Sequence, residues 1–323
     1  MPKPSRLTDA FHRWAMRVWF PVLAWGAPRW KRGWQQFHAR WIIFLIMVVY
    51  PKPKRLIRKN LARIMGLPER SWKVRRAASA MLRHFAFYWC DLFRFAQLPP
   101  AAAHACLDGV SGMEHVDQAA ALGKGVVLLT GHLGNWELGG VLLGQWQRPV
   151  SVVYVRDKFA DAERFRSFLR RQGGVHEIAI EPRASLSSLP VLRALREGRL
   201  VAMQGDRDFD GRGVPASFFG ERVRFPRGPF LVALLTGAPI VPTFVGYTPR
   251  YRFTARVCPP ITVPSTGDRE RDLAAAVQEW ARVLEDEVRA HPSQWYTFYD
   301  YFVEHHAEEE ADAAPAAPRR ASA

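Results

Sequence analysis

The hydrophobic pattern of the chain alternates, beyond about residue 68, between short apolar runs and longer amphipathic stretches. The short runs, rich in β-branched residues, predict strands at 125–130, 150–155, 177–180, 199–204, 239–247 and 251–258. The stretches between and after them predict helices at about 135–147, 158–172, 186–197, 228–237 and 268–290. This order predicts an α/β fold with a mostly parallel central sheet flanked by helices.

Three segments are predicted along the chain. A helix with a broad apolar face covers about 68–97 and opens the main domain, residues 65–303. Residues 1–64 form a separate helical arm that we expect to associate with a membrane. Residues 304–323 lack a core-forming pattern, so we expect a disordered tail.

The arm differs from the rest of the chain in composition. The whole chain has a formal net charge of +16, and residues 1–64 contain 14 of its 46 Lys and Arg residues but only one acidic residue, Asp9. Six of the twelve tryptophans also lie there, interleaved with the basic residues: Trp14, Trp19, Trp25, Trp30, Trp34 and Trp41. Tryptophan favours the bilayer interface and basic side chains attract anionic headgroups, so the arm predicts contact with a membrane surface.

The apolar runs of the arm bear on how it meets the membrane. Residues 18–28 and 41–51 are uncharged, but each run has 11 residues, whereas a spanning helix needs about 20. Because Pro21 also interrupts the first run, we expect helices that lie in the membrane surface. An amphipathic helical pair packed on the protein's own core is the alternative. Long aliphatic runs are out of place in a single-strand nucleic-acid binder, so we expect no nucleic-acid partner.

Candidate chemistry concentrates in VVLLTGHLGNWELGG, residues 126–140. His132 follows a predicted strand directly, and ligands of open α/β sheets bind beyond the carboxyl ends of strands. Asn135 is a candidate N-cap for the next helix. On one continuous helix His132 and Glu137 would lie about 140° apart. The two side chains can therefore meet only if His132 lies in the turn and Glu137 in the first helical turn.

An imidazole oriented by a carboxylate can act as a general base. We therefore interpret His132 and Glu137 as a candidate catalytic pair. Because no serine-nucleophile motif is present, we expect His132 to activate an acceptor hydroxyl that attacks the substrate directly. The alternative is that His132 is a structural turn residue and that Glu137 interacts with the helix dipole. No second histidine lies close enough in sequence to suggest a metal site. The three widely spaced cysteines, Cys90, Cys106 and Cys258, predict reduced thiols in a cytoplasmic setting.

Residues 112–116 and 121–137, GMEHV and ALGKGVVLLTGHLGNWE, resemble the late acyltransferases of lipid A biosynthesis, the lauroyl/myristoyl transferase family. That family lies within the H-x4-D/E glycerolipid acyltransferase superfamily, and the resemblance covers roughly residues 55–303. Further blocks agree with it in order: VVYVRD (152–157), MQGDRD (203–208), SFFGERVRFPRGP (217–229), TGAPIVPTF (236–244) and SQWYTFYDYF (293–302).

The resemblance implies an enzyme on the cytoplasmic face of the inner membrane. Such an enzyme transfers a fatty acyl chain from acyl-carrier protein or coenzyme A to a hydroxyl of a lipid A-type precursor or related glycolipid. His132 would be its general base and Glu137 the partner of that base. Asp206 matches an acid that the family uses near the active site. The arginines that would contact phosphate groups of donor or acceptor are Arg156, Arg171 and Arg207, and no cofactor or metal is needed.

Two departures from the family leave the acceptor open. The apolar runs of the arm are short and interrupted, and the ending QWYTFYDYF is aromatic and acidic where lipid A enzymes tend to be basic. Another glycolipid or a lysophospholipid is therefore an alternative acceptor. A thioesterase-like hydrolase and a non-catalytic lipid-binding protein are rival functions. Asp206 can also be a structural partner of Arg207 or Arg224, and each candidate arginine can be a solvated surface charge.

Overall fold

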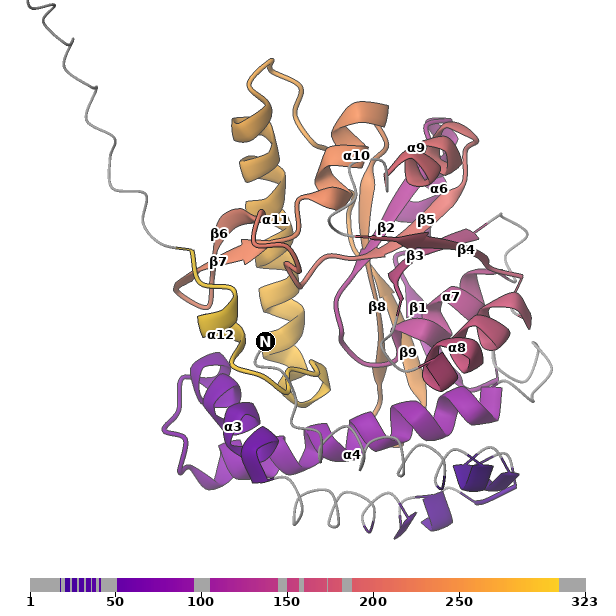
Figure 1. Cartoon of the computed structure of the whole chain (residues 1–323), viewed down its shortest axis with the longest axis vertical. Helices are drawn as coiled ribbons and strands as arrows, with labels where there is room; N and C mark the ends of the chain where they lie inside the picture. Colours follow the sequence, from indigo (N-terminus) through magenta and orange to yellow (C-terminus); the bar gives the residue numbers. More distant parts are fainter. Residues whose placement is uncertain are drawn as a thin grey trace, which may run out of the picture.

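A computed structural model describes residues 51–95, 105–144, 150–156, 160–172, 174–181 and 188–307, and isolated positions between 18 and 41. Its central sheet has seven strands in the order β1-β9-β8-β2-β5-β3-β4 (Figure 1). These are β1 (Leu107–Ser111), β2 (Val126–Thr130), β3 (Val150–Val155), β4 (His176–Ile180), β5 (Leu200–Gln204), β8 (Ile240–Tyr247) and β9 (Phe253–Val257). A separate antiparallel hairpin consists of β6 (Val214–Phe218) and β7 (Glu221–Phe225).

Helices surround the sheet. They are α3 (Pro51–Met65), α4 (Trp72–Phe95), α6 (Met113–Ala121), α7 (Trp136–Gly144), α8 (Ala160–Gln172), α9 (Leu189–Arg196), α10 (Gly228–Thr236), α11 (Arg269–Ala290), the 3₁₀ turn η1 (Pro292–Gln294) and α12 (Tyr301–Glu304). The predicted α/β class and the mostly parallel sheet are confirmed. Strands β8, β2, β5, β3 and β4 are mutually parallel, whereas β9 is antiparallel to β8 and pairs in parallel with β1.

All six predicted strands are present, and each boundary lies within two residues of its expected position. The sequence analysis did not predict β1 or the β6–β7 hairpin. Strand β1, LDGVS, is largely exposed at the edge of the sheet and therefore has no apolar run. The hairpin packs on α11, and Pro215 lies in its first strand. Both hairpin strands alternate in burial but have only five residues each, too short for a distinct apolar run in the sequence.

The sheet is buried on both faces, as parallel sheets generally are. Val127 and Leu129 of β2 pack in a core formed with α9, α10 and α11. Val126 and Leu128 point to the opposite face and pack in a cluster with α6. On that second face α7 contacts β8 and β3, and α8 contacts β4. The alternation of side chains along β2 therefore divides the molecule into three layers.

Helix α4 lies across the end of the sheet at which β8 finishes (Figure 1). The hydroxyl of Tyr247, the last residue of β8, donates to the Asp91 carboxylate of α4 at 2.9 Å in the buried interior. Helix α3 packs against α4 and contributes Ile57, Leu61 and Ile64 to the main core. Residues 51–64, which we placed in the arm, are thus part of the packed structure, while the three-segment division stays a prediction.

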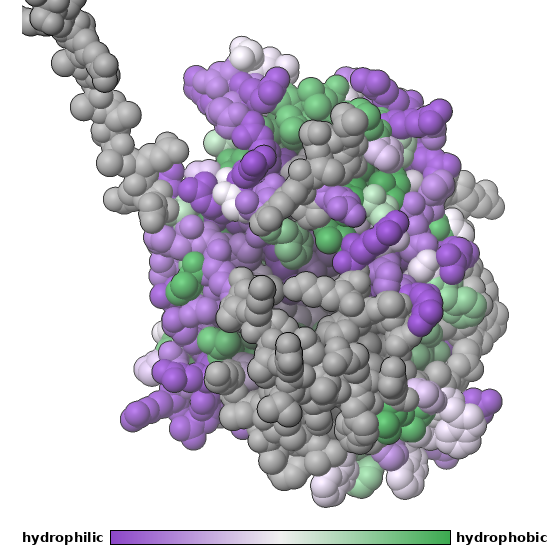
Figure 2. Space-filling view, in the orientation of Figure 1, coloured by the Kyte–Doolittle hydropathy of each residue, from purple (hydrophilic) through white to green (hydrophobic). Residues whose placement is uncertain are grey.

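Among the described residues, no helix combines the length and apolar character that a membrane crossing requires. Residues 1–17 and 42–50 of the predicted arm, and 308–323 of the predicted tail, lie outside the described residues. Figure 2 shows mostly polar and charged side chains over the described surface of one face, with smaller apolar areas between them. Strands β2 and β5 run parallel to β8, so their carboxyl ends lie at the same end of the sheet. Ligands of open α/β sheets bind at this end.

Candidate active site

The turn between β2 and α7 carries the predicted histidine. Two backbone hydrogen bonds fix it: the Gly134 N–H donates to the Gln294 carbonyl at 2.9 Å, and the Asn135 N–H donates to the Val245 carbonyl at 2.8 Å. Gly134 has a φ of 63°, and a Cβ there would lie 2.0 Å from the Val245 carbonyl oxygen. Only glycine fits this position, because any side chain would collide with β8.

Asn135 is the N-cap of α7, as predicted. Its Oδ1 accepts a hydrogen bond from the Leu138 N–H at 3.2 Å, which satisfies one of the free donors at the helix start. The first helical residue, Trp136, places its ring 5.2 Å from the His132 ring, edge to face. The helix start and the imidazole therefore lie side by side.

The His132 imidazole is bonded to Asp206. Its Nδ1 lies 2.7 Å from Asp206 Oδ1, and the His132 backbone N–H donates to Oδ2 at 2.9 Å. The two residues meet because β2 and β5 are parallel neighbours in which Thr130 pairs with Gln204, the last residue of each strand. Each side chain lies two positions beyond its strand. Asp206, expected near the site only through the family resemblance, is thus the acid that orients His132.

The Asp206 carboxylate is fully buried and accepts a third hydrogen bond from Trp295 Nε1 at 3.0 Å. Burial raises the pKa of a carboxyl, but the electrostatic interaction with His132, the hydrogen bonds from His132 and the positive charge of Arg207 together outweigh it. They hold the pKa of Asp206 well below its usual value. The residue is therefore an anion at neutral pH.

An anionic Asp206 decides the tautomer of His132. A carboxylate only accepts hydrogen bonds, so Nδ1 carries the proton and Nε2 keeps its lone pair. Burial, and then the charge of Arg207, lower the pKa of His132 from 6.5, while Asp206 opposes the shift. The imidazole is therefore neutral at pH 7, with Nε2 as the atom that can take a proton. In the described part of the chain, no cluster of three or more His, Cys, Asp or Glu side chains could hold a metal ion.

Glu137 does not contact His132, so the predicted hydrogen bond between them is wrong. Its carboxylate instead forms a bidentate ion pair with Arg170 of α8, at 2.9 Å from Nε and 2.5 Å from Nη2. Both side chains are buried, and the Arg170 guanidinium also lies 4.7 Å from the centre of the Tyr154 ring. The first turn of α7 points Glu137 toward α8, so the carboxylate joins these two helices. A catalytic role for Glu137 stays a prediction.

The three predicted phosphate-binding arginines lie in different settings. Arg207 is at the site, where its Nη2 donates to the Tyr296 carbonyl at 2.6 Å. Arg156 is exposed directly after β3. Arg171 is 67% exposed on α8, with an ion-pair partner 3.9 Å away. The structure thus brings Arg207 together with His132 and Asp206, and places the other two at the surface.

Sequence analysis missed Arg166 of α8. Its charge acts on the imidazole, lowering the pKa of His132, and its guanidinium lies 5.6 Å from the centre of the Trp89 ring of α4. Arg166 and Arg170 are four residues apart, a spacing that puts both on one face of a helix. This four-residue spacing is the feature of the sequence that could have predicted that both arginines point to the same side.

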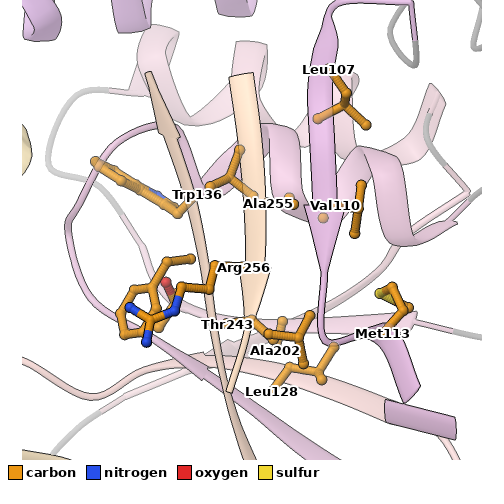
Figure 3. A pocket seen from close by; sticks show the side chains of 15 residues that line it. Leu107, Val110, Met113, Leu128, Trp136, Ala202, Thr243, Ala255 and Arg256 are labelled. Carbon is orange, nitrogen blue, oxygen red and sulfur yellow. The ribbon is translucent and has the colours of Figure 1, made fainter. Parts of the chain in front are cut away.

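An apolar pocket lies on the α6–α7 face of the sheet, and Trp136, whose ring contacts the His132 ring, is part of its lining (Figure 3). Its lining comes from β1, α6, β2, α7, β5, β8 and β9: Leu107, Val110, Met113, Leu128, Thr130, Trp136, Gly139, Gly140, Ala202, Thr243, Phe244, Val245, Ala255, Arg256 and Val257. Figure 3 shows Trp136 and Met113 on opposite sides of it. Gly139 and Gly140 leave room between α7 and the sheet, because a Cβ at either would contact Val245 or Val152.

Comparison with known proteins identifies a family and relatives for this chain. The model of the bacterial lipid A biosynthesis acyltransferase family matches residues 6–303. Phosphatidylinositol mannoside acyltransferases from two strains of Mycobacterium tuberculosis, CDC 1551/Oshkosh and H37Rv, are each 30% identical over 243 residues, 74% of this chain and 74% of theirs. The protein of the same name from Mycolicibacterium smegmatis is 28% identical over 240 residues, 74% of this chain and 76% of its own.

The buried ion pair makes a prediction about stability. The change Glu137→Met leaves the Arg170 guanidinium buried without its bidentate partner, so we expect the free energy of unfolding to fall by about 3 kcal/mol. The double change Glu137→Met with Arg170→Met should recover most of that loss, because two apolar side chains of similar length replace the pair. Urea denaturation measures both.

The exposed Glu279 of α11 supplies the matched control. Glu279→Met should change the free energy of unfolding by less than about 0.5 kcal/mol. If Glu137→Met is as stable as the unmodified protein, the ion pair does not hold α7 and α8 together.

Proposed function

The chain belongs to the bacterial lipid A biosynthesis acyltransferase family, and we propose that this acyltransferase moves a fatty acyl chain from an acyl thioester to a hydroxyl group of a glycolipid. One observation supports the proposal: a neutral imidazole, oriented by the buried Asp206 carboxylate, contacts the ring of Trp136, which lines an apolar pocket. The family supports acyl transfer, and the site supplies a base and a place for the acyl chain.

The proposed reaction needs one base and no covalent enzyme intermediate. His132 Nε2 takes the proton of the acceptor hydroxyl as its oxygen attacks the thioester carbonyl carbon. When the tetrahedral intermediate collapses, the C–S bond breaks and the departing thiolate takes the proton from the imidazolium. Asp206 stabilises that imidazolium throughout. A base positioned in this way contributes about 10²–10⁴ in rate.

Two further features support a lipid substrate. The pocket beside Trp136 is lined almost entirely by apolar side chains, which suits a hydrocarbon chain. Arg207 and Arg166 lie near the imidazole, and guanidinium groups pair well with the phosphate oxygens of a thioester carrier or a phospholipid headgroup. We propose acyl-carrier protein or acyl-CoA as donor, with Arg156 and Arg171 as further contacts at the surface.

The acceptor is proposed from the relatives. Because phosphatidylinositol mannoside acyltransferases are similar over about three quarters of this chain, a phosphorylated glycolipid is our proposed acceptor class. A lipid A-type precursor and a mannosylated phosphatidylinositol are its two representatives for assay.

The arm supports a position on the inner membrane, at its cytoplasmic face. Its residues Leu23 and Ala27 pack on Cys90 and Phe93 of α4, so part of the arm covers the protein's own core. A second set of its side chains stays exposed by half or more: Trp25, Trp34, Phe37 and Trp41. The last three recur at three- and four-residue spacing and contact one another, as one face of an interfacial helix does. The arm thus combines both alternatives, core packing and a face for lipid.

The first test removes the base. We expect His132→Ala to abolish acyl transfer in an assay with acyl thioester and glycolipid, while circular dichroism and vesicle binding stay unchanged. A non-catalytic lipid-binding protein would show no transfer before the change either. Free fatty acid released at the same rate with and without acceptor would favour hydrolysis, and transfer retained by His132→Ala would contradict the mechanism.

The second test uses pH. Since the pKa of His132 is lowered, kcat/KM should rise with pH through a value below 6.5 and then level off. Asp206→Asn removes a group that raises that pKa, so the acidic limb should move to lower pH, and kcat should fall by about 10²–10⁴. The control Asp286→Asn, exposed on α11, should leave both unchanged. An acidic limb that moves upward in Asp206→Asn would show that another group is the base.

The third test concerns the membrane. Replacing Trp34, Phe37 and Trp41 by Ala together should lower binding to vesicles containing anionic lipid about tenfold or more, measured by sedimentation, because these side chains supply the apolar contact. Trp72→Ala on α4, where the side chain is 65% exposed, is the matched loss of an exposed tryptophan and should bind as before. Unchanged binding by the triple variant would show that this face does not meet the lipid.

A further inference from the structure

Gln204 lies beside the dyad that His132 and Asp206 form, and its side-chain nitrogen has no hydrogen-bond partner among the described residues. The residue ends β5, and its Nε2 is buried. An unpaired buried donor is costly. Folded proteins therefore keep few of them, and each one calls for an explanation such as a catalytic role. This donor lies two positions before Asp206, so it is close to the proposed site of reaction.

The register of the sheet places Gln204 between the pocket and the dyad. Ala202 lines the pocket, and alternation along β5 puts Gln204 on the same face. On β2, the in-register partner of Gln204 is Thr130, which also lines the pocket. The side chains on this face of β2 and β5 therefore change from apolar to polar at the same level of the sheet. An apolar pair, Leu128 and Ala202, is followed by the polar pair Thr130 and Gln204, and then by His132 and Asp206.

In the proposed reaction, a bound acyl chain passes these residue pairs in the same order. An acyl chain in the apolar part of the pocket has its carbonyl carbon near His132 Nε2, so its first atoms pass the Thr130–Gln204 pair. Two residues of a strand span roughly 6.6 Å, a distance that a glutamine side chain can bridge to reach the carbonyl oxygen.

We propose that the side-chain amide of Gln204 donates a hydrogen bond to the acyl carbonyl oxygen as that oxygen becomes an oxyanion. The inference deepens the proposed function and rests on it, since it requires acyl transfer at His132. As the acceptor oxygen bonds to the carbonyl carbon, the π electrons of the C=O bond move to the oxygen, and the Gln204 N–H stabilises that charge. When the C=O bond forms again, the C–S bond breaks and the hydrogen bond weakens.

Near His132, Arg207 Nε, Tyr296 Oη and Asn135 Nδ2 are also buried without a hydrogen-bond partner among the described residues, but none of these three lies on β2 or β5 in line with the pocket. Two other donors are engaged. Arg207 Nη2 donates to the Tyr296 carbonyl, and the Thr130 hydroxyl is oriented toward the Gly131 carbonyl at 3.5 Å. The Gln204 amide, by contrast, is buried and holds no bond that must break first. A donor fixed in a dry site stabilises developing charge more than water does, because nothing has to reorganise.

The decisive variant is Gln204→Met, which keeps the length of the side chain and removes its donor. We expect kcat to fall by about 10²–10³, with KM for the acyl thioester changed by less than about threefold. The acidic limb of the pH profile should stay in place, because no charge near His132 has changed. The midpoint of thermal unfolding should be equal or higher, since an unpaired buried amide is gone.

Gln204→Glu keeps the shape, removes both N–H donors and adds charge, so its kcat should be at least as low. Gln118→Met, exposed on α6, is the matched control and should retain full kcat.

Two results would overturn the inference. The first is a kcat of Gln204→Met within about threefold of the unmodified enzyme. The second is a loss of more than about 5 °C in the unfolding midpoint together with a moved acidic limb, which would make Gln204 a structural support of Asp206. His132→Ala in the same assay distinguishes failure of the proposed function from failure of the role of Gln204. If His132→Ala stays active, the proposed function is wrong. If His132→Ala is inactive while Gln204→Met stays active, only the role of Gln204 is wrong.

Discussion

The hydrogen bonds that converge on the Asp206 carboxylate are the constraint on which the rest of the site depends. Three N–H groups reach it, two from His132 and one from the Trp295 indole, and the carboxylate is fully buried. A buried charge with fewer partners would take up a proton or disrupt its surroundings. The β2–α7 turn, the end of β5 and the segment after η1 must therefore be in place together before His132 has its partner.

The aromatic segment near the end of the chain explains how distant parts of the sequence meet at this point. The Tyr296 N–H donates to the His132 carbonyl, and the Tyr301 hydroxyl donates to the Asp206 carbonyl at 2.8 Å. From α11 in the same core, Trp280 Nε1 donates to the Gly205 carbonyl at 2.8 Å. The segment after β5 is thus held through its backbone by the side chains of two large buried aromatic residues, and the segment after β2 by the backbone of a third. The geometry of the dyad is consequently a property of the whole core, and the block SQWYTFYDYF belongs to the site although it lies far from His132 in sequence.

Sequence patterns predicted what periodicity can encode. The apolar runs located six strands, and the position of His132 after one of them placed it at the carboxyl edge of the sheet. Which acid meets the imidazole depends on the register between β2 and β5 and on the direction of the first turn of α7. Neither is encoded in a spacing within one segment, so the local sequence favours Glu137 as the partner although Asp206 fills that place. The sequence could not predict the unpaired Nε2 of Gln204 either, because the hydrogen bonds of a side chain depend on which groups the fold places around it.

The two buried acids near the imidazole differ in what their partners do during the reaction. Glu137 faces Arg170, a permanent cation, so this ion pair has the same strength in the ground state and in the transition state. In the proposed mechanism, Asp206 faces an imidazole that is neutral before the reaction and gains a proton while the acceptor attacks. Only interactions that strengthen on the way to the transition state lower the barrier. The chemistry therefore favours Asp206 as the acid that assists the base, and Glu137 as the acid that keeps α7, and with it the turn of His132, against α8.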